Sequence, residues 1–493
     1  MLSSSMIVFL VIGMSLVALL IWHPWHKAPL SDQPEGSNAT ANNKSEIWGI
    51  KKPSNGRQVD GYAMPSSVTT GENLTFFVSC KANSFSTDIF RLGYYGGSDA
   101  KLVEKVKKKV CEFQKTPTPD PNTGLIIARW PASLNVLIEK SWQPGVYLAR
   151  VTDNEGYQSF VPFIVRSSAV KSQYLFIHSV ADEEAYNYWG GNSLYQDLTP
   201  KLGLPRAVEV SLERPFIRNS GAGFLLAWEY PMIKFLEQHN YSVDYATDLD
   251  VNNNPAILKK YKAVIIDGHD EYWTHKMWDG YLDAVHSGTN LAVFAANTAY
   301  RFIRVENDPV TNQPDSVIVC YKNSVLDPET KINPQLSTPK TIHFAPLNLS
   351  ESELLGETWG GENLRGKYPN LGYISNIDHY SGNLVVTNSS SWIFQGTDLK
   401  SGDVIPGVVG YEYDRYLPTT PHPAPVSIIF AGLTKNTKGI TREQDSVYYS
   451  LPDGGQVFDA GTIEWSWGLD PALPTYSPQL VKVTENILNH FGQ

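Results

Sequence analysis

The chain has 493 residues, enough for roughly three domains of ordinary size or for one large domain and a smaller one. A formal charge of −10 without a basic stripe argues against nucleic-acid binding, and a hydrophobic content of 42% is typical of a globular protein. Three scattered cysteines are too few for a disulfide scaffold or a zinc site.

Residues 1–29 predict a membrane segment. Residues 6–22 form an uninterrupted run of low polarity, with no basic stretch before it and no small-residue cleavage site after it. This pattern favours an uncleaved signal anchor, and the alternative is a cleaved signal peptide and a secreted protein. Residues 30–56 are rich in Ser, Asn, Gly and Pro and predict a flexible tether. We therefore expect a membrane-anchored protein whose globular part is extracytoplasmic or lumenal.

Two further features suit such a compartment. Cys80 and Cys111 lie in the same predicted β domain and could form a disulfide, which would leave Cys320 as a thiol in the core. Six N-x-[ST] tripeptides are compatible with a glycoprotein. Their asparagines are Asn38, Asn43, Asn73, Asn240, Asn348 and Asn388.

Residues 57–168 predict an immunoglobulin-like β-sandwich. Short strand-like runs such as LTFFVSC and GVYLARV alternate there with Gly-containing turns. Residues 101–109 carry several lysines with valines between them, which is typical of the solvated face of a strand.

Residues 169–493 predict a doubly wound α/β domain, because strand-like runs now alternate with amphipathic helical patterns. The most informative stretch is 262–288. Its residues 263–266 form a short apolar run of mostly β-branched residues, which predicts a buried parallel strand. Apolar residues at helical spacing follow, and Gly288 is placed as the residue that ends the helix.

Polar side chains follow several of these predicted strands. His269 and Glu271 follow the strand at 263–266, and Tyr186 and Asn297 each follow another strand. Because ligands of an open α/β sheet bind outside the carboxyl ends of its strands, we expect these side chains to lie at one edge. Glu412, in the motif GYEYDR, is a further candidate.

The residues around the first strand also have a purely structural interpretation. Thr274 or Asp270 would cap the following helix, Glu271 would complement its dipole, and His269 would be an ordinary loop residue. The chain contains no G-x-S-x-G, Walker A, H-E-x-x-H or C-x-x-C motif, so those reaction classes are not indicated.

The motifs together resemble those of one family. FRLGYYGG, PGVYLARV, AYNYWGGNSLY, GHDEYW, FAANTAYR, VCYK, GYEYD and GTIEWSWGL occur in matching order over residues 59–490, and the sequence resembles the large subunit of N,N-dimethylformamidase and its relatives. This resemblance implies a β-sandwich joined to a glutamine-amidotransferase-like α/β domain. It also implies a mononuclear iron held by two tyrosines and one glutamate.

Residue by residue, the resemblance implies Tyr147, Tyr186 and Glu271 as iron ligands. A tyrosine that enters a late strand of such a sandwich can instead be a tyrosine corner, whose hydroxyl bonds nearby backbone. Tyr188 and Tyr272 are therefore alternative tyrosine ligands for Tyr147 or Tyr186.

The resemblance also implies four residues around the iron. These are His269, Asn297, Lys322 and Glu412. The structural alternative for Lys322 is a surface amine, and for Glu412 it is an ion pair with Arg415.

Two phenolates and a carboxylate form a hard, all-oxygen ligand set that suits ferric iron better than copper or zinc. Such an iron would polarise an amide carbonyl and acidify a water. His269 or Glu412 would transfer protons, and Asn297 and Lys322 would orient the substrate or stabilise the oxyanion. A cysteine nucleophile is not indicated, since Asn297 stands where an amidotransferase-like domain would place it and Cys320 lies inside a strand.

We therefore expect an iron-dependent amide hydrolase that acts on a small amide or an amide-bearing glycan and has no nucleic-acid partner. The membrane segment is a departure from the dimethylformamidase pattern, which leaves the substrate open. The alternative is a non-catalytic glycan- or protein-binding module that uses an aromatic face. That face would be formed by Trp273, Trp359, Trp465 and Trp467.

Overall fold

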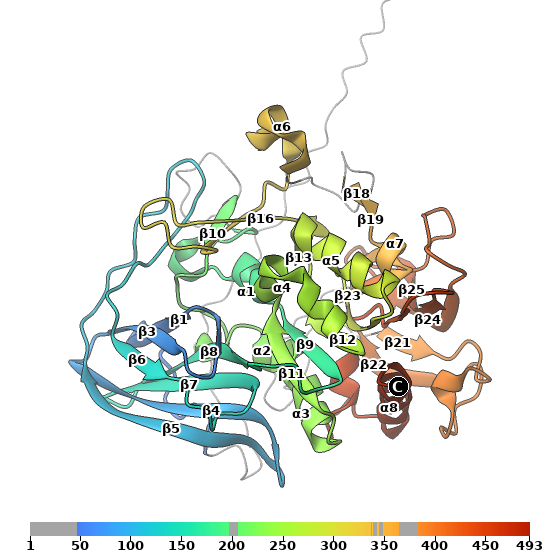
Figure 1. The fold of residues 1–493 in the computed structure, drawn as a ribbon, viewed down its shortest axis with the longest axis horizontal. Helices are drawn as coiled ribbons and strands as arrows, with labels where there is room; N and C mark the ends of the chain where they lie inside the picture. Colours follow the sequence, from blue (N-terminus) through green and yellow to red (C-terminus); the bar gives the residue numbers. More distant parts are fainter. Residues whose placement is uncertain (1–46, 197–205, 337, 339–342, 345–348, 364–381) are drawn as a thin grey trace, which may run out of the picture. The chain divides into compact units, whose positions relative to one another are not determined.

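Two β-sheets come first in the computed structural model, which describes residues 47–196, 206–336, 338, 343–344, 349–363 and 382–493 (Figure 1). The five-stranded sheet has the order β2 (Ser67–Thr69), β8 (Gln158–Arg166), β7 (Gly145–Asp153), β4 (Ser84–Tyr95) and β5 (Ser98–Val110). The three-stranded sheet has the order β1 (Val59–Met64), β3 (Asn73–Cys80) and β6 (Leu134–Leu137).

Strand β7 shows how the two faces of the larger sheet differ, because successive side chains of a strand point to opposite faces. Tyr147, Ala149 and Val151 pack in the core between the two sheets. Val146 and Leu148 pack in a different core, which includes the helix α3 (Tyr230–Gln238). Strand β7 is therefore buried on both faces of the sheet.

The disulfide expected from the sequence is present, since Cys80 and Cys111 are bonded to each other, and Cys320 is a buried free thiol. The predicted lysine face is also confirmed, because Lys101 and Lys107–Lys109 of β5 are exposed. Three of the six predicted glycosylation asparagines lie in the described residues, and all three are exposed. They are Asn73, Asn240 and Asn388.

A seven-stranded sheet forms the centre of the remaining chain. Its order is β11 (Val243–Thr247), β9 (Tyr174–His178), β12 (Ala263–His269), β14 (Asn290–Ala296), β26 (Gln456–Asp459), β25 (Thr441–Ser450) and β24 (Ser427–Lys435). The strands from β11 to β26 run parallel, and the last two pair antiparallel. The carboxyl ends of β9, β12 and β14 therefore lie at one edge.

Helices cover both faces of this sheet. On one face, Phe176 and Ile265 share a core with α3 and with α8 (Pro478–Phe491). On the other face, Ile177 and Ile266 pack with α4 (Asp248–Asn253) and α5 (His275–His286). The alternation along each parallel strand thus explains the continuous apolar runs in the sequence.

The corner between β12 and α5 follows the sequence prediction closely. The helix begins after Thr274, whose hydroxyl accepts a hydrogen bond from the N–H of Met277, and Gly288 lies just beyond its end with φ of +100°. Gly268 has φ of +74°, and a Cβ there would lie 2.6 Å from the Cβ of Trp228. Only glycine fits this close approach, which directs the following His269 toward the edge of the sheet.

Smaller elements surround this edge. The short helices are α1 (Val180–Tyr186), α2 (Leu225–Trp228), α6 (Glu329–Ile332) and α7 (Ser352–Leu355). One small sheet has the order β10 (Glu209–Ser211), β17 (Val317–Val319) and β16 (Arg304–Glu306). The two-stranded sheets pair β13 (Tyr272–Trp273) with β15 (Arg301–Phe302), β18 (His343–Phe344) with β19 (Leu349–Ser350), β20 (Thr358–Glu362) with β23 (Glu412–Arg415), and β21 (Gly382–Val385) with β22 (Val404–Val409).

The fold is therefore a mixed one, with β-sheets first and an α/β arrangement after them, as the sequence predicts. The predictions of an immunoglobulin-like sandwich, of an amidotransferase-like domain and of a boundary near residue 168 remain predictions. The predicted anchor at residues 1–29 lies outside the described residues. Within the part of the chain that the structure describes, no helix is both long and apolar enough to cross a membrane.

Candidate active site

The ends of three parallel strands bring the candidate residues together. Strand β9 leads into α1, which carries Asp182 and Tyr186, and β12 ends at His269, two residues before Glu271. Strand β14 ends one residue before Asn297. The segments that follow β12 and β14 also pair with each other, since the N–H of Arg301 donates to the carbonyl of Glu271 at 2.7 Å.

The carboxylate of Glu271 is the centre of the site. One of its oxygens, Oε2, accepts hydrogen bonds from the hydroxyls of Tyr186 at 3.0 Å and Tyr195 at 2.6 Å. The other oxygen, Oε1, accepts from Nε of Arg301 at 3.1 Å. The hydroxyl of Tyr272 donates to that of Tyr195 at 2.6 Å. Arg301 therefore fixes one carboxylate oxygen, and the other faces two phenols.

The charges around Glu271 favour its ionised form. Burial alone would raise its pKa, but the positive charges of Lys322, Arg301 and His269 outweigh burial and hold the pKa below its usual range. The two phenols respond in the opposite way. Burial and the Glu271 carboxylate raise the pKa of Tyr186 and Tyr195 well above the ordinary value. Without a cation, the site therefore holds one carboxylate and two neutral phenols.

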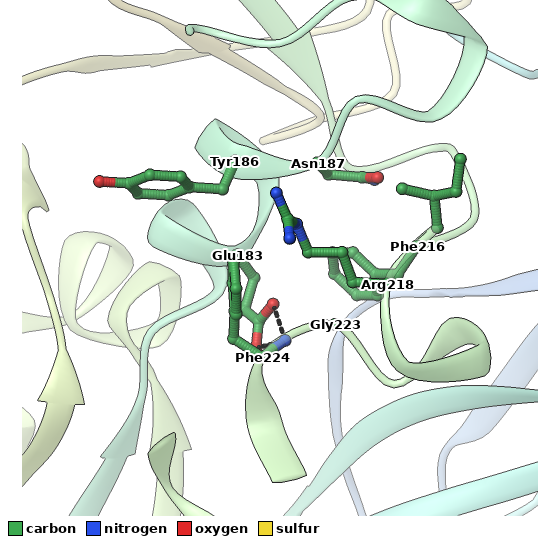
Figure 2. A pocket seen from close by; sticks show the side chains of 8 residues that line it. Glu183, Tyr186, Asn187, Phe216, Arg218, Gly223 and Phe224 are labelled. Carbon is green, nitrogen blue, oxygen red and sulfur yellow. Dashed lines mark hydrogen bonds between the residues drawn. The ribbon is translucent and has the colours of Figure 1, made fainter. Parts of the chain in front are cut away.

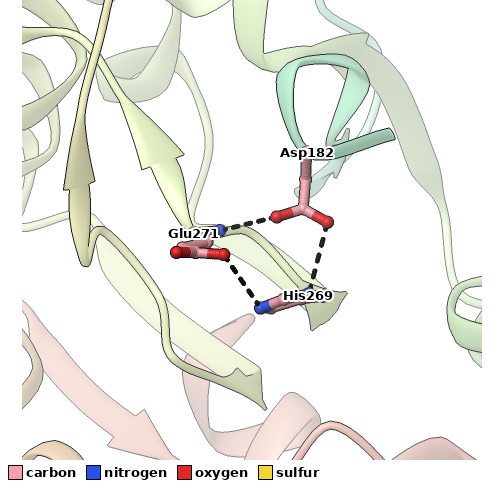
Figure 3. A group of neighbouring side chains, drawn as sticks. All are labelled: Asp182, His269 and Glu271. Atoms are coloured by element: carbon pink, nitrogen blue, oxygen red, sulfur yellow. Dashed lines mark hydrogen bonds and ion pairs between the residues drawn. The ribbon is translucent and has the colours of Figure 1, made fainter. Parts of the chain in front are cut away.

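His269 lies between acidic groups, as Figure 3 shows for two of them. Its Nδ1 is 3.3 Å from Oδ2 of Asp182, and its Nε2 is 3.8 Å from Oε2 of Glu271 and 3.9 Å from Oε1 of Glu412. Burial disfavours a charged imidazole, but the carboxylates of Asp182 and Glu412 outweigh it and raise the pKa of His269 to about 10. The ring is therefore an imidazolium at neutral pH.

Asp182, His269 and Glu271 offer ligand atoms within 4.8 Å of one another, so they could hold a metal ion. Both oxygens of Asp182 are already engaged, however. One faces His269 Nδ1, and the other accepts the N–H of Glu271 at 3.2 Å. Asp182 is therefore better placed to orient the imidazole and the Glu271 backbone than to bind a cation.

Lys322 and Glu412 are both buried at this edge. Lys322 is therefore not a surface amine, which was the structural alternative for this residue. The Lys322 ammonium lies 3.2 Å from the ring centroid of Tyr195 and has no hydrogen-bond partner in the described chain. Burial lowers its pKa to about 7. Glu412 Oε2 accepts a hydrogen bond from Nε1 of Trp359 at 2.9 Å, and the structure gives no ion pair between Glu412 and Arg415 among the described residues.

Asn297 has φ of +57°, and its N–H donates to Asp414 at 2.9 Å. Its side-chain nitrogen lies 3.4 Å from His269 Nε2, and its side-chain oxygen is buried without a partner among the described residues. An amide side chain with a free oxygen beside an imidazolium suits contact with a polar ligand.

Tyr147 is the one predicted site residue that the structure does not bring to this cluster. Its hydroxyl donates to the carbonyl of Gln143 at 2.6 Å, and its ring stacks between Trp142 and Phe163. The alternation along β7 explains this position, since Tyr147 faces the core between the two sheets of the β region. The alternative weighed from the sequence, a hydroxyl that bonds nearby backbone, describes this contact.

Tyr195 is the functional candidate that sequence reasoning missed. It closes the motif AYNYWGGNSLY, nine residues after Tyr186, and the two rings stack with centroids 4.2 Å apart. Of the two alternative tyrosines, Tyr272 directs its hydroxyl to that of Tyr195, and Tyr188 lies beside Arg218. The repeated tyrosines of the motif were the available signal, but spacing alone does not select among them.

A small pocket, with a cavity volume of about 10 Å³, reaches Tyr186 from one side (Figure 2). Arg218 and Phe224 are among its lining residues, and the Arg218 guanidinium lies 5.0 Å from the Phe224 ring centroid. Glu183 accepts the N–H of Phe224 at 2.7 Å. The pocket is therefore narrow, with an aromatic wall and one cationic side chain.

A buried ion pair beneath the site predicts a measurable pH dependence of stability. His178 Nδ1 lies 2.7 Å from Glu229 Oε2. Burial opposes the imidazolium, but the Glu229 charge outweighs it and raises the pKa of His178 from 6.5 to about 9. Because the folded-state pKa is raised, the stabilisation is complete below about pH 6.5 and is lost as the pH rises through about 9.

We therefore expect His178→Gln to remove on the order of 2 kcal/mol of stability at neutral pH and less at pH 10. Urea unfolding of both proteins from pH 6 to 10 measures the difference. A gap that stays constant across this range would contradict the assigned charge on His178.

Comparisons with known proteins give a consistent family. The family described as "N,N-dimethylformamidase beta subunit-like, C-terminal" matches residues 86–479. The chain is 25% identical over 305 residues to the N,N-dimethylformamidase beta subunit of Alcaligenes sp, which covers 55% of this chain and 38% of that protein. It is 24% identical over 304 residues to the protein of the same name from Paracoccus aminophilus, with the same coverage of 55% and 38%.

The chain thus spans about two fifths of the length of these curated relatives, because each match covers 38% of the relative. A crystal structure of an uncharacterized protein from Bacillus anthracis str. Ames aligns over 22% of this chain and 84% of that one, with 12% identity. Its TM-score of 0.14 is too low to support any argument about fold.

Proposed function

Because the chain belongs to the N,N-dimethylformamidase beta subunit-like, C-terminal family, we propose that it hydrolyses the C–N bond of an amide with the help of a bound metal ion. The observation that carries this proposal is the convergence of the Tyr186 and Tyr195 hydroxyls on one oxygen of Glu271. The names of the two curated relatives support an amide as the substrate.

The residues present fit a hard cation. Tyr186, Tyr195 and Glu271 offer three oxygen donors, and Arg301 Nε donates to the carboxylate oxygen that faces away from the phenols. Two phenolates and a carboxylate carry three negative charges, which suits ferric iron better than softer metals. We therefore assign these three residues as ligands of a mononuclear non-haem iron. When bound, the ion would supply Lewis acidity toward the amide carbonyl and water.

The titration of the phenols supports this assignment. In the absence of a cation, burial and Glu271 keep both tyrosines protonated. A trivalent ion would replace their two protons, so binding is expected to release protons and to weaken at low pH. The site is thus built so that the cation and the phenol protons compete for the same oxygens.

His269 is the proposed proton donor to the leaving amine. It is charged at neutral pH, and Asp182 holds its Nδ1 while its Nε2 faces the centre of the site. Amide cleavage requires protonation of the departing nitrogen, which an imidazolium can supply. Glu412, whose Oε1 lies 3.9 Å from Nε2 of His269, is the second proposed proton-transfer group and would accept the proton of the attacking water.

Asn297 and Lys322 are the proposed binding groups for the substrate. Asn297 offers a buried side chain with an unpaired oxygen, and the Lys322 ammonium lies over the Tyr195 ring without a hydrogen-bond partner among the described residues. The Asn297 oxygen can accept a hydrogen bond from an N–H of the amide and so orient it, and the Lys322 ammonium can donate to the amide carbonyl and to the negative charge that develops on it.

The substrate class is a small amide or the amide group of a glycan. The pocket beside Tyr186 has a cavity volume of only about 10 Å³, which supports a small reacting group. The disulfide Cys80–Cys111 and the exposed sequons at Asn73, Asn240 and Asn388 support an extracytoplasmic or lumenal compartment, with residues 1–29 as the membrane anchor. The acidic net charge gives no support for a nucleic-acid partner.

A non-catalytic binding module is not favoured. The aromatic face on which that alternative rested does not exist, because Trp273, Trp465 and Trp467 are fully buried. Trp359, the fourth, is partly buried and donates to Glu412. The tryptophans stabilise the fold and the site, and they offer no continuous surface for a ligand.

Elemental analysis and visible spectroscopy of the purified chain test the proposal. Wild type should contain close to one iron per chain and show a phenolate-to-iron charge-transfer band, and Glu271→Gln should lose both. Asn297→Ala should keep the iron and the band but lower the turnover of an amide substrate about 100-fold. A folded wild type that is colourless and binds no added iron would overturn the proposed function.

A further inference from the structure

Three other carboxylates meet beneath the edge of the sheet. Glu357 immediately precedes β20, Asp414 lies in β23 and Asp459 ends β26. Each offers an oxygen within 4.8 Å of those of the other two, and no more than 1% of any of the three residues is exposed. They come from separate strands, so the fold itself brings them together.

Few hydrogen-bond donors and no ion pairs offset the negative charge of these three carboxylates among the described residues. Neither oxygen of Glu357 and only one oxygen of Asp459 has a hydrogen-bond partner among the described residues. Within that part of the chain, no lysine, arginine or histidine forms an ion pair with any of the three. Burial raises the pKa of each, that of Asp414 to about 7. Like charges at this distance require either shared protons or a cation.

Comparison with other buried acids of this protein favours a cation. Asp182, Glu183 and Asp248 are equally buried, and each accepts at least one backbone N–H. Glu357 accepts none among the described residues, and the same holds for Asp267, Asp270 and Glu351. Of these four acids, only Glu357 belongs to a group of three whose carboxylate oxygens lie within 4.8 Å of one another. A buried carboxylate without donors is a candidate metal ligand, since a cation satisfies it without any N–H.

The backbone at Gly461 approaches the Glu357 carboxylate closely. Gly461 has φ of +59°, and a Cβ there would lie 2.9 Å from Glu357 Oε1 and 2.1 Å from the carbonyl oxygen of Asp445. Any other residue at this position would push against the carboxylate. The glycine therefore lets the backbone approach the Glu357 carboxylate closely.

We propose that Glu357, Asp414 and Asp459 bind a hard divalent cation, calcium or magnesium, in a structural site separate from the cluster of Tyr186, Tyr195 and Glu271. Three carboxylates provide the all-oxygen, strongly anionic donor set that these ions prefer. The two ions share this chemistry, and calcium is favoured because it tolerates an irregular arrangement of ligands better than magnesium does.

This cation has a consequence for the proposed active site. Asp414 accepts the N–H of Asn297, which has a left-handed backbone conformation at the end of β14. A cation that fixes Asp414 would hold Asn297 in this turn. Asp414 is then a positioning residue for Asn297, and this one step, unlike the cation site itself, rests on the proposed function.

Metal analysis of the full chain tests the site independently of the iron. Wild type should retain one calcium or magnesium per chain, Glu271→Gln should lose iron but keep this ion, and Glu357→Gln should lose this ion but keep the iron. Glu353→Gln, which changes a partly exposed acid in α7 nearby, is the matched control and should keep both. Loss of the ion from the control as well would overturn the assignment of ligands.

Thermal unfolding of the wild type keeps the test decisive even if Glu357→Gln does not fold. Chelation with EDTA should lower the melting temperature by several degrees, and addition of calcium alone or magnesium alone identifies the ion that restores it. The amount of calcium or magnesium released on chelation should equal one ion per chain. A wild type that carries neither ion and does not respond to either would overturn the proposal and leave shared protons as the explanation.

Discussion

Tyr195→Phe is expected to abolish tight iron binding, with a loss of affinity and activity greater than about 100-fold, the upper range for groups that only support a ligand. The substitution removes one of the two hydroxyls that face Glu271 Oε2 and keeps the ring that stacks on Tyr186. The charge-transfer band should disappear together with the iron. Titration with ferric salt, followed in the visible range, measures the change.

Tyr147→Phe is the matched control for this experiment. It also removes one tyrosine hydroxyl, but that hydroxyl only bonds the carbonyl of Gln143. We expect a loss of about 1 kcal/mol of stability and an unchanged iron content. If Tyr147→Phe instead lost the iron while Tyr195→Phe kept it, the ligand set deduced from the geometry would be wrong.

The contrast between these tyrosines shows what the sequence could predict. Strand ends of a parallel sheet are recognisable from apolar runs, so the meeting of Tyr186, His269, Glu271 and Asn297 at one edge follows from pattern and topology. The helix α5, with its cap at Thr274, follows for the same reason. These features depend on local periodicity, which a single sequence contains.

The position of Tyr195 could not be predicted in this way. It lies in a loop after α1, where no periodicity fixes the direction of a side chain, and it reaches Glu271 only because the chain turns back on itself. The position of Tyr147 could not be predicted for a different reason. Its strand was recognised, but which of the two faces of β7 meets the site depends on the packing of both sheets.

Glu412 illustrates a third limit. It lies in β23, which pairs antiparallel with β20 and does not belong to the seven-stranded sheet. The argument from parallel strand ends therefore does not reach it, and only the motif GYEYD pointed to it. The cluster of Glu357, Asp414 and Asp459 could not be predicted either, because three acids far apart in the sequence come together only once the arrangement of the strands is known.

Substitution of Arg214 is expected to cause a large loss of stability. It is 1% exposed, and its Nε lies 3.0 Å from Oε2 of Glu184, which is also buried. Its other nitrogens donate to the carbonyls of Glu184 at 2.9 Å and Asn192 at 3.0 Å. Arg214→Met removes the cationic partner of the buried Glu184 carboxyl and the hydrogen bonds to two backbone carbonyls, so we expect a loss of about 3–5 kcal/mol, measured by urea unfolding.

The same contacts make Arg214 a positioning residue for the candidate ligands. Glu184 stands two residues before Tyr186, and Asn192 stands three residues before Tyr195, so one guanidinium ties together the two segments that carry the phenols. Arg214→Lys keeps the charge but cannot bridge both carbonyls in the same plane. We therefore expect it to recover part of the stability and little of the iron affinity.

A double variant separates these two roles. Arg214→Met with Glu184→Leu removes the buried charge along with its partner, which should restore much of the lost stability. It does not restore the link between the two tyrosine segments, so iron binding should remain weak. Recovery of both stability and iron binding would show that Arg214 only neutralises Glu184.

The pH dependence of the single variant provides the last check. Burial raises the pKa of Glu184 to about 7 even beside Arg214, and removal of the guanidinium should raise it further. Because a carboxyl with a raised folded-state pKa destabilises the protein only above its unfolded pKa, the deficit of Arg214→Met should shrink as the pH falls toward 5. Lys259→Met, which breaks an exposed ion pair with Asp283, should change stability little at either pH, since solvent screens that pair.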